Sequence, residues 1–119
     1  MNRQRTTASA SLRLATWFCI ILLAVLSLVP AEHMVRTGLP GRLEHFIAYA
    51  GSATVTKGGY GGQYGRMGVI GFYWVYAGIL EYLQQFSPGR DASIWDFSAS
   101  ALGAFCGALA ATLFARTAD

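Results

Sequence analysis

Charged residues are scarce in this sequence. Asp, Glu, Lys and Arg make up 13% of its 119 residues, about half the usual share of a soluble domain. A soluble protein this short needs a large polar surface to cover its core. Hydrophobic residues make up 54% of the chain, and the few charges lie at the ends of long apolar runs. The composition therefore argues against an ordinary soluble domain and predicts one membrane domain, residues 1–119.

Cysteines are also few, and the basic residues are not clustered. Cys19 and Cys106 both lie inside apolar runs, whereas a disulfide framework needs paired cysteines in exposed segments. We therefore interpret both as small packing residues. The net charge is +3, but the nine basic residues are scattered and form no stripe. This pattern gives no support for nucleic acid as a partner.

Four apolar runs are candidates for membrane-crossing helices. They cover approximately residues 13–30, 43–56, 67–86 and 94–114, and Pro30 ends the first of them. The predicted fold class is all-α, an integral membrane bundle of four transmembrane helices. The first run also resembles a signal peptide, because basic residues precede an apolar stretch. That alternative stays open at this point.

The second run is the shortest and the most polar. It reaches only about 20 Å, a length that also suits a core helix or a re-entrant segment. Four polar residues recur in it at spacings of four, three and four: His45, Tyr49, Ser52 and Thr56. They share one helical face, which we expect to face the protein interior. The glycine-rich stretch that follows, residues 57–66, is predicted to be a flexible connection between helices.

The fourth run carries a face of small residues. Gly103 and Gly107 lie on this face, which begins with Asp96 and Ser100. Small-residue faces let helix backbones approach each other closely in lipid. We therefore expect another helix to lie against Gly103 and Gly107.

The basic residues predict the orientation. If the N-terminus is cytoplasmic, that side holds six of them: Arg3, Arg5, Arg13, Lys57, Arg66 and Arg116. The other side then holds three: Arg36, Arg42 and Arg90. Cytoplasmic segments carry the excess of Lys and Arg, so both termini are predicted to be cytoplasmic.

In this topology, charged and polar residues from separate segments lie at one depth near the outer face: Arg42, Glu44, His45, Glu81, Arg90 and Asp96. An ionisable residue inside a membrane costs about 2.5–3.5 kcal/mol, and by default it suggests a functional site. Structural alternatives remain for each residue. Glu81 and Arg90 can form a structural ion pair, Asp96 can cap its helix, and His45 can be a packing residue. Arg42 and Glu44 can be solvated interfacial charges.

The same residues resemble the VanZ-like family of small bacterial membrane proteins. The resemblance rests on the sequence EHFIAY over residues 44–49 and, more specifically, on GILEYLQQFSPGR over residues 78–90. It continues through ASIWD at residues 92–96, and it covers roughly residues 30–110. Two positions depart from the family pattern, which often has aspartate at Gly41 and asparagine at Ser100. Both departures make the polar site smaller.

The resemblance implies a multi-pass helical protein of the bacterial inner membrane and cell envelope, in some members linked to glycopeptide antibiotic resistance. The polar set of the family is retained: His45, Glu81, Gln84, Arg90 and Asp96.

The first functional hypothesis is a site that binds or processes an envelope lipid, a glycolipid or a glycopeptide-related molecule. Arg90 and Arg42 would hold an anionic headgroup, with Gln84 and Asp96 as further binding residues. Glu81 and His45 are the candidate acid–base residues. Whether the protein is an enzyme stays open. Metal-ligand spacing and a Gly-x-Ser-x-Gly motif are both missing from the sequence, so we expect no metal and no cofactor.

The second hypothesis is a small accessory subunit of a larger membrane protein complex, or a homo-oligomer. The small-residue face of the fourth run and the short second run would both gain from a membrane partner. In one variant of this hypothesis, His45 is an axial ligand of a tetrapyrrole. A transporter or channel would also need an oligomer, because four short helices do not easily enclose a pore.

Overall fold

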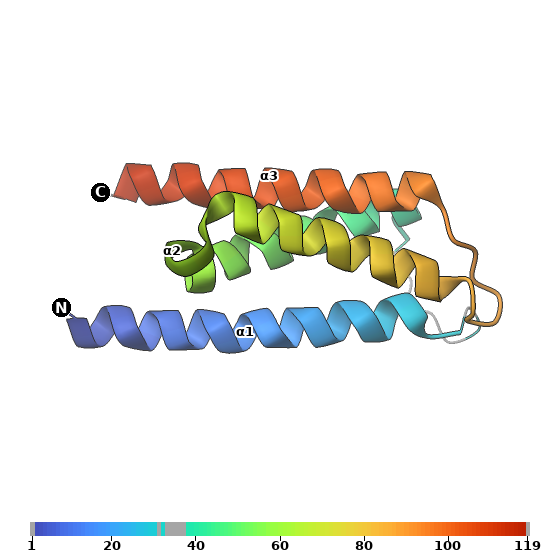
Figure 1. The fold of residues 1–119 in the computed structure, drawn as a ribbon, viewed down its shortest axis with the longest axis horizontal. Helices are drawn as coiled ribbons and strands as arrows, with labels where there is room; N and C mark the ends of the chain where they lie inside the picture. The colour runs from blue at the N-terminus through green and yellow to red at the C-terminus, as the bar shows by residue number, and fades with distance from the viewer. Residues whose placement is uncertain (1, 31, 33–37, 119) are drawn as a thin grey trace.

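The structure is a computed structural model that describes residues 2–30, 32 and 38–118. These residues form three helices and no strand: α1 (Asn2–Leu28), α2 (Gly41–Gln84) and α3 (Ile94–Ala118). Figure 1 shows α1 and α3 along opposite sides of an elongated bundle, with α2 between them. The all-helical fold class is therefore confirmed.

Helix α2 is bent sharply at Gly65. This residue has φ 75° and ψ 170°, which are not helical values, whereas the residues on either side are helical. Positive φ is readily available only to glycine. Residues 41–64 therefore form a first arm and residues 66–84 a second arm, which turns back along the first (Figure 1). Four separate transmembrane helices are not confirmed, because the second and third apolar runs belong to this one bent helix.

The prediction of a flexible connection over residues 57–66 is wrong. The stretch is helical except at Gly65, and two of its glycines, Gly58 and Gly59, lie against α1. A Cβ at Gly59 would lie 3.0 Å from the backbone nitrogen of Arg13. The guanidinium Nε of Arg13 also donates to the Gly59 carbonyl at 2.9 Å. Glycine costs a helix about 1 kcal/mol relative to alanine, and here this close contact with α1 offsets the cost.

The predicted contact of Gly103 and Gly107 with another helix is confirmed. A Cβ at Gly103 would lie 3.0 Å from the Cα of Phe46, and one at Gly107 would lie 2.9 Å from the Cα of Ala50. Both glycines are buried. Helix α3 therefore packs backbone to backbone against the first arm of α2, because these two positions carry no side chain.

The core of the bundle is a cluster of apolar residues, four of them alanines, with a polar stripe buried beside it, and the outside of the bundle is also apolar. Tyr49, Ser52 and Thr56 are buried and His45 is half-buried, so the polar stripe of the second run does face inward. The hydroxyls of Thr56 and Tyr73 share a hydrogen bond of 2.7 Å that joins the two arms of α2. Large apolar residues are exposed on every helix, among them Phe18, Ile21, Val75, Ile79, Leu113 and Phe114.

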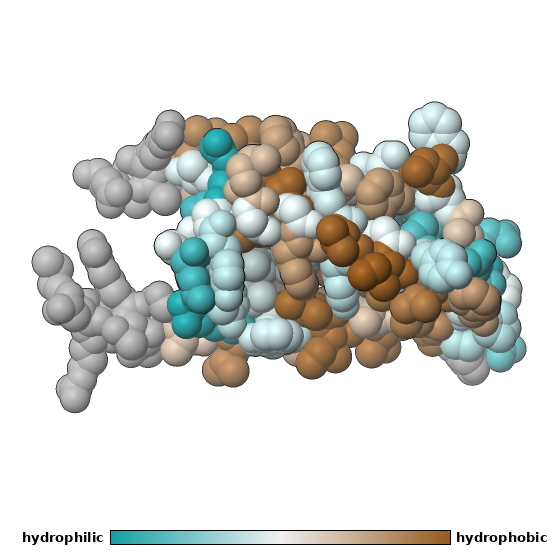
Figure 2. Space-filling model, in the orientation of Figure 1, coloured by the Kyte–Doolittle hydropathy of each residue, from teal (hydrophilic) through white to brown (hydrophobic). Residues whose placement is uncertain are grey.

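The dimensions and the surface suit a bilayer. Within the part of the chain that the structure describes, two helices contain segments long and apolar enough to cross a membrane, Ala10–Leu28 and Ile94–Phe114. The molecule is 50 Å long, and a hydrocarbon core is about 30 Å thick. On the face seen in Figure 2, hydrophobic residues lie over the middle of the bundle and hydrophilic residues gather toward its two ends.

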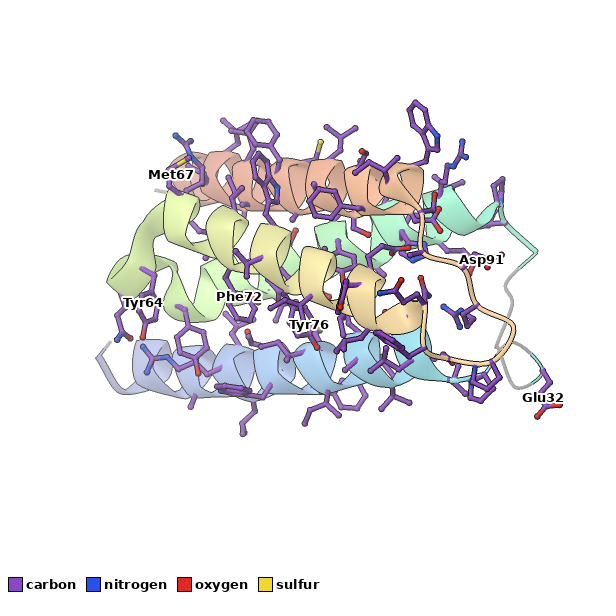
Figure 3. The ribbon with its side chains drawn as sticks, turned by 45° about the vertical axis from the view of Figure 1, so that its right-hand side comes forward. Glu32, Tyr64, Met67, Phe72, Tyr76 and Asp91 are labelled. Atoms are coloured by element: carbon purple, nitrogen blue, oxygen red, sulfur yellow. The ribbon has the colours of Figure 1, made fainter. Side chains whose placement is uncertain are left out.

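Helix α1 is bonded to α2 along its length. Near one end it makes the Arg13–Gly59 contact. Further along, the Tyr76 hydroxyl donates to the carbonyl of Ile20. Figure 3 shows Phe72 and Tyr76 between α1 and the second arm of α2. Through these contacts α1 is packed against both arms of α2.

Candidate functional site

Three ionisable side chains from three helical segments meet at one end of the bundle. His45 lies on the first arm of α2, Glu81 on the second arm, and Asp96 in the first turn of α3. One ring nitrogen of His45 and one carboxylate oxygen from each acid lie within 4.8 Å of one another. All three residues are half-buried. The sequence predicted these residues at one depth, and the structure brings them together.

Glu81 holds the start of α3. Its Oε1 accepts a hydrogen bond of 2.7 Å from the backbone N–H of Ser93. The Ser93 hydroxyl in turn accepts a bond of 3.4 Å from the backbone N–H of Asp96. Ser93 is therefore the N-cap of α3. In a capping box, the acidic side chain three residues after the N-cap accepts a hydrogen bond from the N-cap's backbone N–H. Here Glu81, from α2, accepts that bond instead.

Asp96 is not bonded to the cap through its carboxylate, so its side chain is directed elsewhere. Asp96 Oδ1 lies 3.9 Å from Arg42 Nε. The Arg42 guanidinium also lies over the ring of Trp95, at 5.6 Å from the ring centroid. The Arg42 side chain is 64% exposed, against 27% for Asp96. Arg42 thus lies on the solvent-exposed side of the site, which we call its open side, and remains accessible to a ligand.

His45 is held by its own helix. Its Nδ1 lies 2.8 Å from the carbonyl oxygen of Gly41, one turn earlier. Because a carbonyl oxygen only accepts, Nδ1 carries the proton of this bond. The other ring nitrogen, Nε2, is then the one that remains to bind a proton or a ligand.

Gln84 and Arg90 contact the end of α1. The Gln84 side-chain NH₂ donates to the carbonyl of Ser27 at 3.0 Å. Arg90 Nη1 donates to the carbonyls of Leu26 at 3.3 Å and Val29 at 3.1 Å. The last carbonyls of a helix have no partner within the helix, so these side chains satisfy them. This gives both predicted binding residues a structural role.

Sequence reasoning missed two serines of this region. The Ser87 hydroxyl donates to the carbonyl of Leu28 at 2.8 Å, which adds a third side chain to the end of α1. Ser93 is the α3 cap described above. Ser93 could have been found, because Ser-x-x-Asp before an apolar run is a helix-start signal. Ser87 has no such signal in the sequence.

A small cavity lies between His45 and Arg90. It measures about 110 Å³ and is lined by residues of α1, the first arm of α2 and the connection to α3: Leu23, Leu26, Ser27, Glu44, His45, Ala48, Tyr49 and Arg90. Figure 3 places Asp91 at this end of the bundle and Tyr64 and Met67 at the opposite end. Arg90 and His45 therefore border one space, although Arg90 also anchors α1.

No family model, no curated protein and no solved structure matches this chain. The resemblance to the VanZ-like family rests on the sequence motifs alone.

Proposed function

We propose that this protein is a VanZ-like integral membrane protein of the bacterial inner membrane, which crosses the bilayer four times. Its polar site, near the outer face, binds or processes an anionic envelope lipid, a glycolipid or a glycopeptide-related molecule. The observation that carries the proposal is the convergence of His45, Glu81 and Asp96 within 4.8 Å. Arg42 lies beside them on the open side.

Four crossings are supported by the lengths of the two arms of α2. At 1.5 Å per residue, the first arm is about 36 Å long and the second about 28 Å. Together with α1 and α3, they give four helical rods that are comparable in length with a hydrocarbon core of about 30 Å. The exposed apolar residues on all three helices give the outside of the bundle a lipid-facing character.

The orientation is supported by the positions of the helix ends. The start of α1, the bend of α2 and the end of α3 lie at the same end of the bundle (Figure 1). That end holds all six basic residues assigned to the cytoplasm: Arg3, Arg5, Arg13, Lys57 and Arg66 on α1 and α2, and Arg116 in the last turn of α3. The polar site lies at the opposite end. Of the three basic residues assigned to the outside, Arg36 lies outside the described residues.

The chemistry of the site suits an anion. Arg42 offers a largely exposed guanidinium, whose planar fork matches phosphate and carboxylate groups. Glu81 and His45 supply the acid–base groups for any processing step. Both are positioned by backbone contacts, Glu81 through Ser93 and His45 through Gly41. Such fixed groups are what a binding or catalytic site requires.

The proposal is tested by purifying the full chain in a mild detergent and recording native mass spectra. Retained anionic lipid, present in the wild type and depleted in Arg42→Gln, supports the proposal. The matched control is Arg66→Gln, an exposed arginine at the opposite end of the bundle. Stoichiometric partner chains without bound lipid would overturn the proposal and favour the accessory-subunit alternative.

A further inference from the structure

The two carboxylates of the site lie close enough to repel each other. Two negative charges no more than 4.8 Å apart repel each other by about 3.5 kcal/mol or more at an effective dielectric constant of about 20. Arg42 approaches Asp96 at 3.9 Å, but its side chain is 64% exposed, so solvent weakens this pairing. The site would gain from a cation that contacts both acids at once.

The surroundings of the three side chains match those of metal ligands. The Nδ1 of His45 is committed to the carbonyl of Gly41, which fixes the ring and leaves Nε2 as the ligand atom. One oxygen of Glu81 is committed to the N–H of Ser93, and the other oxygen is left for a cation. Metal-binding histidines usually donate their second N–H to a carbonyl or a carboxylate, and ligating carboxylates are themselves hydrogen-bonded.

The ligand set selects the kind of ion. Imidazole suits zinc and other first-row transition metals, whereas magnesium and calcium favour ligand sets made of oxygen. Three protein ligands with an open fourth position are the pattern of catalytic zinc sites, with bonds of about 2.0–2.2 Å. Such bonds place ligand atoms about 3.4 Å apart in a tetrahedron. Rotation of the half-buried side chains would close the difference from 4.8 Å.

We propose that His45, Glu81 and Asp96 bind one divalent transition-metal ion, best suited by Zn²⁺, with at least one coordination position left for an exogenous oxygen. The ion neutralises the two carboxylates. The positive charge of Arg42 then makes the net charge of the site positive. An oxygen of an anionic headgroup then completes the coordination. This role of the ion rests on the proposed function, whereas metal binding itself does not.

The test uses the full chain with a purification tag that contains no histidine. The protein is stripped with a chelator in detergent, dialysed, loaded with Zn²⁺ and analysed by mass spectrometry for bound zinc. We expect about one zinc per chain in the wild type and at least tenfold weaker binding in His45→Gln, Glu81→Gln and Asp96→Asn. Asp91→Asn, an exposed acid in the neighbouring connection, is the matched control and should keep full binding.

A second readout does not depend on variants that fold. Co²⁺ in place of Zn²⁺ should give visible absorption bands of a four- or five-coordinate nitrogen and oxygen site. A strong thiolate charge-transfer band would instead assign the metal to Cys19 or Cys106 and overturn the proposal. So would less than a tenth of an equivalent of zinc in the wild type, or full binding in all three ligand variants.

The outcomes for metal and for lipid can be separated. Lipid retention in metal-free protein that takes up no zinc would overturn the metal site and leave the proposed function standing. Stoichiometric zinc binding that requires His45, Glu81 and Asp96, in a protein that retains no anionic lipid, would support the metal site and count against the lipid ligand.

Discussion

The carboxylate of Glu81, on α2, accepts a 2.7 Å hydrogen bond from the backbone N–H of Ser93, which caps α3. This bond joins the second arm of α2 to the start of α3 across the connection between them. It fixes Glu81 beside Asp96, which follows the N-cap Ser93 by three residues and donates its backbone N–H to the Ser93 hydroxyl. A residue proposed to act on a ligand thus also has a structural task, and the two roles can be tested separately.

Glu81→Gln should leave the protein folded, because the amide oxygen can still accept the Ser93 N–H. Glu81→Leu removes the acceptor and should lower the free energy of unfolding by about 1–2 kcal/mol. Thermal unfolding in detergent measures both, with the exposed Gln85→Leu as the control. Because the amide is a poor substitute for a carboxylate as ligand or base, we expect Glu81→Gln to be folded but inactive. Equal destabilisation by both Glu81 changes would show that the charge, rather than the acceptor, supports α3.

Gly103→Ala and Gly107→Ala should each lower the stability by about 1–3 kcal/mol or reduce the folded yield, since the added methyl group would overlap the backbone of the first arm of α2. The matched control is Gly71→Ala, also in a helix. A Cβ there would meet no described atom within 4 Å, so this change should be neutral or slightly stabilising. The folded fraction after size-exclusion chromatography in detergent reports the difference. Equal tolerance at all three positions would show that α3 does not pack on α2 as described.

Ser87→Ala should weaken the attachment of α1 by about 0.5–1.5 kcal/mol, because the Leu28 carbonyl loses its hydroxyl partner. Ser98→Ala serves as the control, since that exposed hydroxyl donates only within its own helix, to Ile94. Unfolding midpoints of the two variants are compared in one detergent. An equal or larger decrease in the unfolding midpoint for Ser98→Ala would show that the Ser87 side chain does not hold the end of α1.

Reporter fusions after Arg66 and after Asp119 should both give a cytoplasmic signal. The physical reason is that the Gly65 bend and the end of α3 lie at the same end of the bundle (Figure 1), where the basic residues are in excess. A third fusion, after Arg90, should give a periplasmic signal and serves as the internal control. A periplasmic signal at either of the first two points would rule out four crossings with both termini cytoplasmic.

The sequence predicted more of the site than of the connections. Helix type, the start of α3 at Ile94 and the inward face of Tyr49, Ser52 and Thr56 follow from hydrophobic and polar periodicity, which is local. The helical course of residues 57–64 could not be predicted, because glycine propensity argues against a helix there. The contacts of Gly58 and Gly59 with α1 offset that preference.

The sequence could predict which residues form the site, but not which groups they bond to. The positions of His45, Glu81 and Asp96 at one depth follow from the spans and their topology. That Arg90 and Gln84 bond to α1 depends on where α1 ends in space, and no spacing in the sequence encodes that position. The proposed metal site could not be predicted for the same reason, because its three ligands come from segments far apart in the chain.

The most direct test of the proposed function is the affinity of the detergent-purified protein for phosphatidylglycerol, titrated by native mass spectrometry in wild type, Arg42→Gln and Arg66→Gln. A charge-assisted hydrogen bond to a phosphate contributes about 1.5–3 kcal/mol, or roughly ten- to hundredfold in affinity. We predict that Arg42→Gln binds at least tenfold more weakly than the wild type, while Arg66→Gln binds equally well. Equal affinities of all three proteins, or equal weakening in both variants, would contradict an anion-binding site at the end of the bundle that holds His45, Glu81 and Asp96.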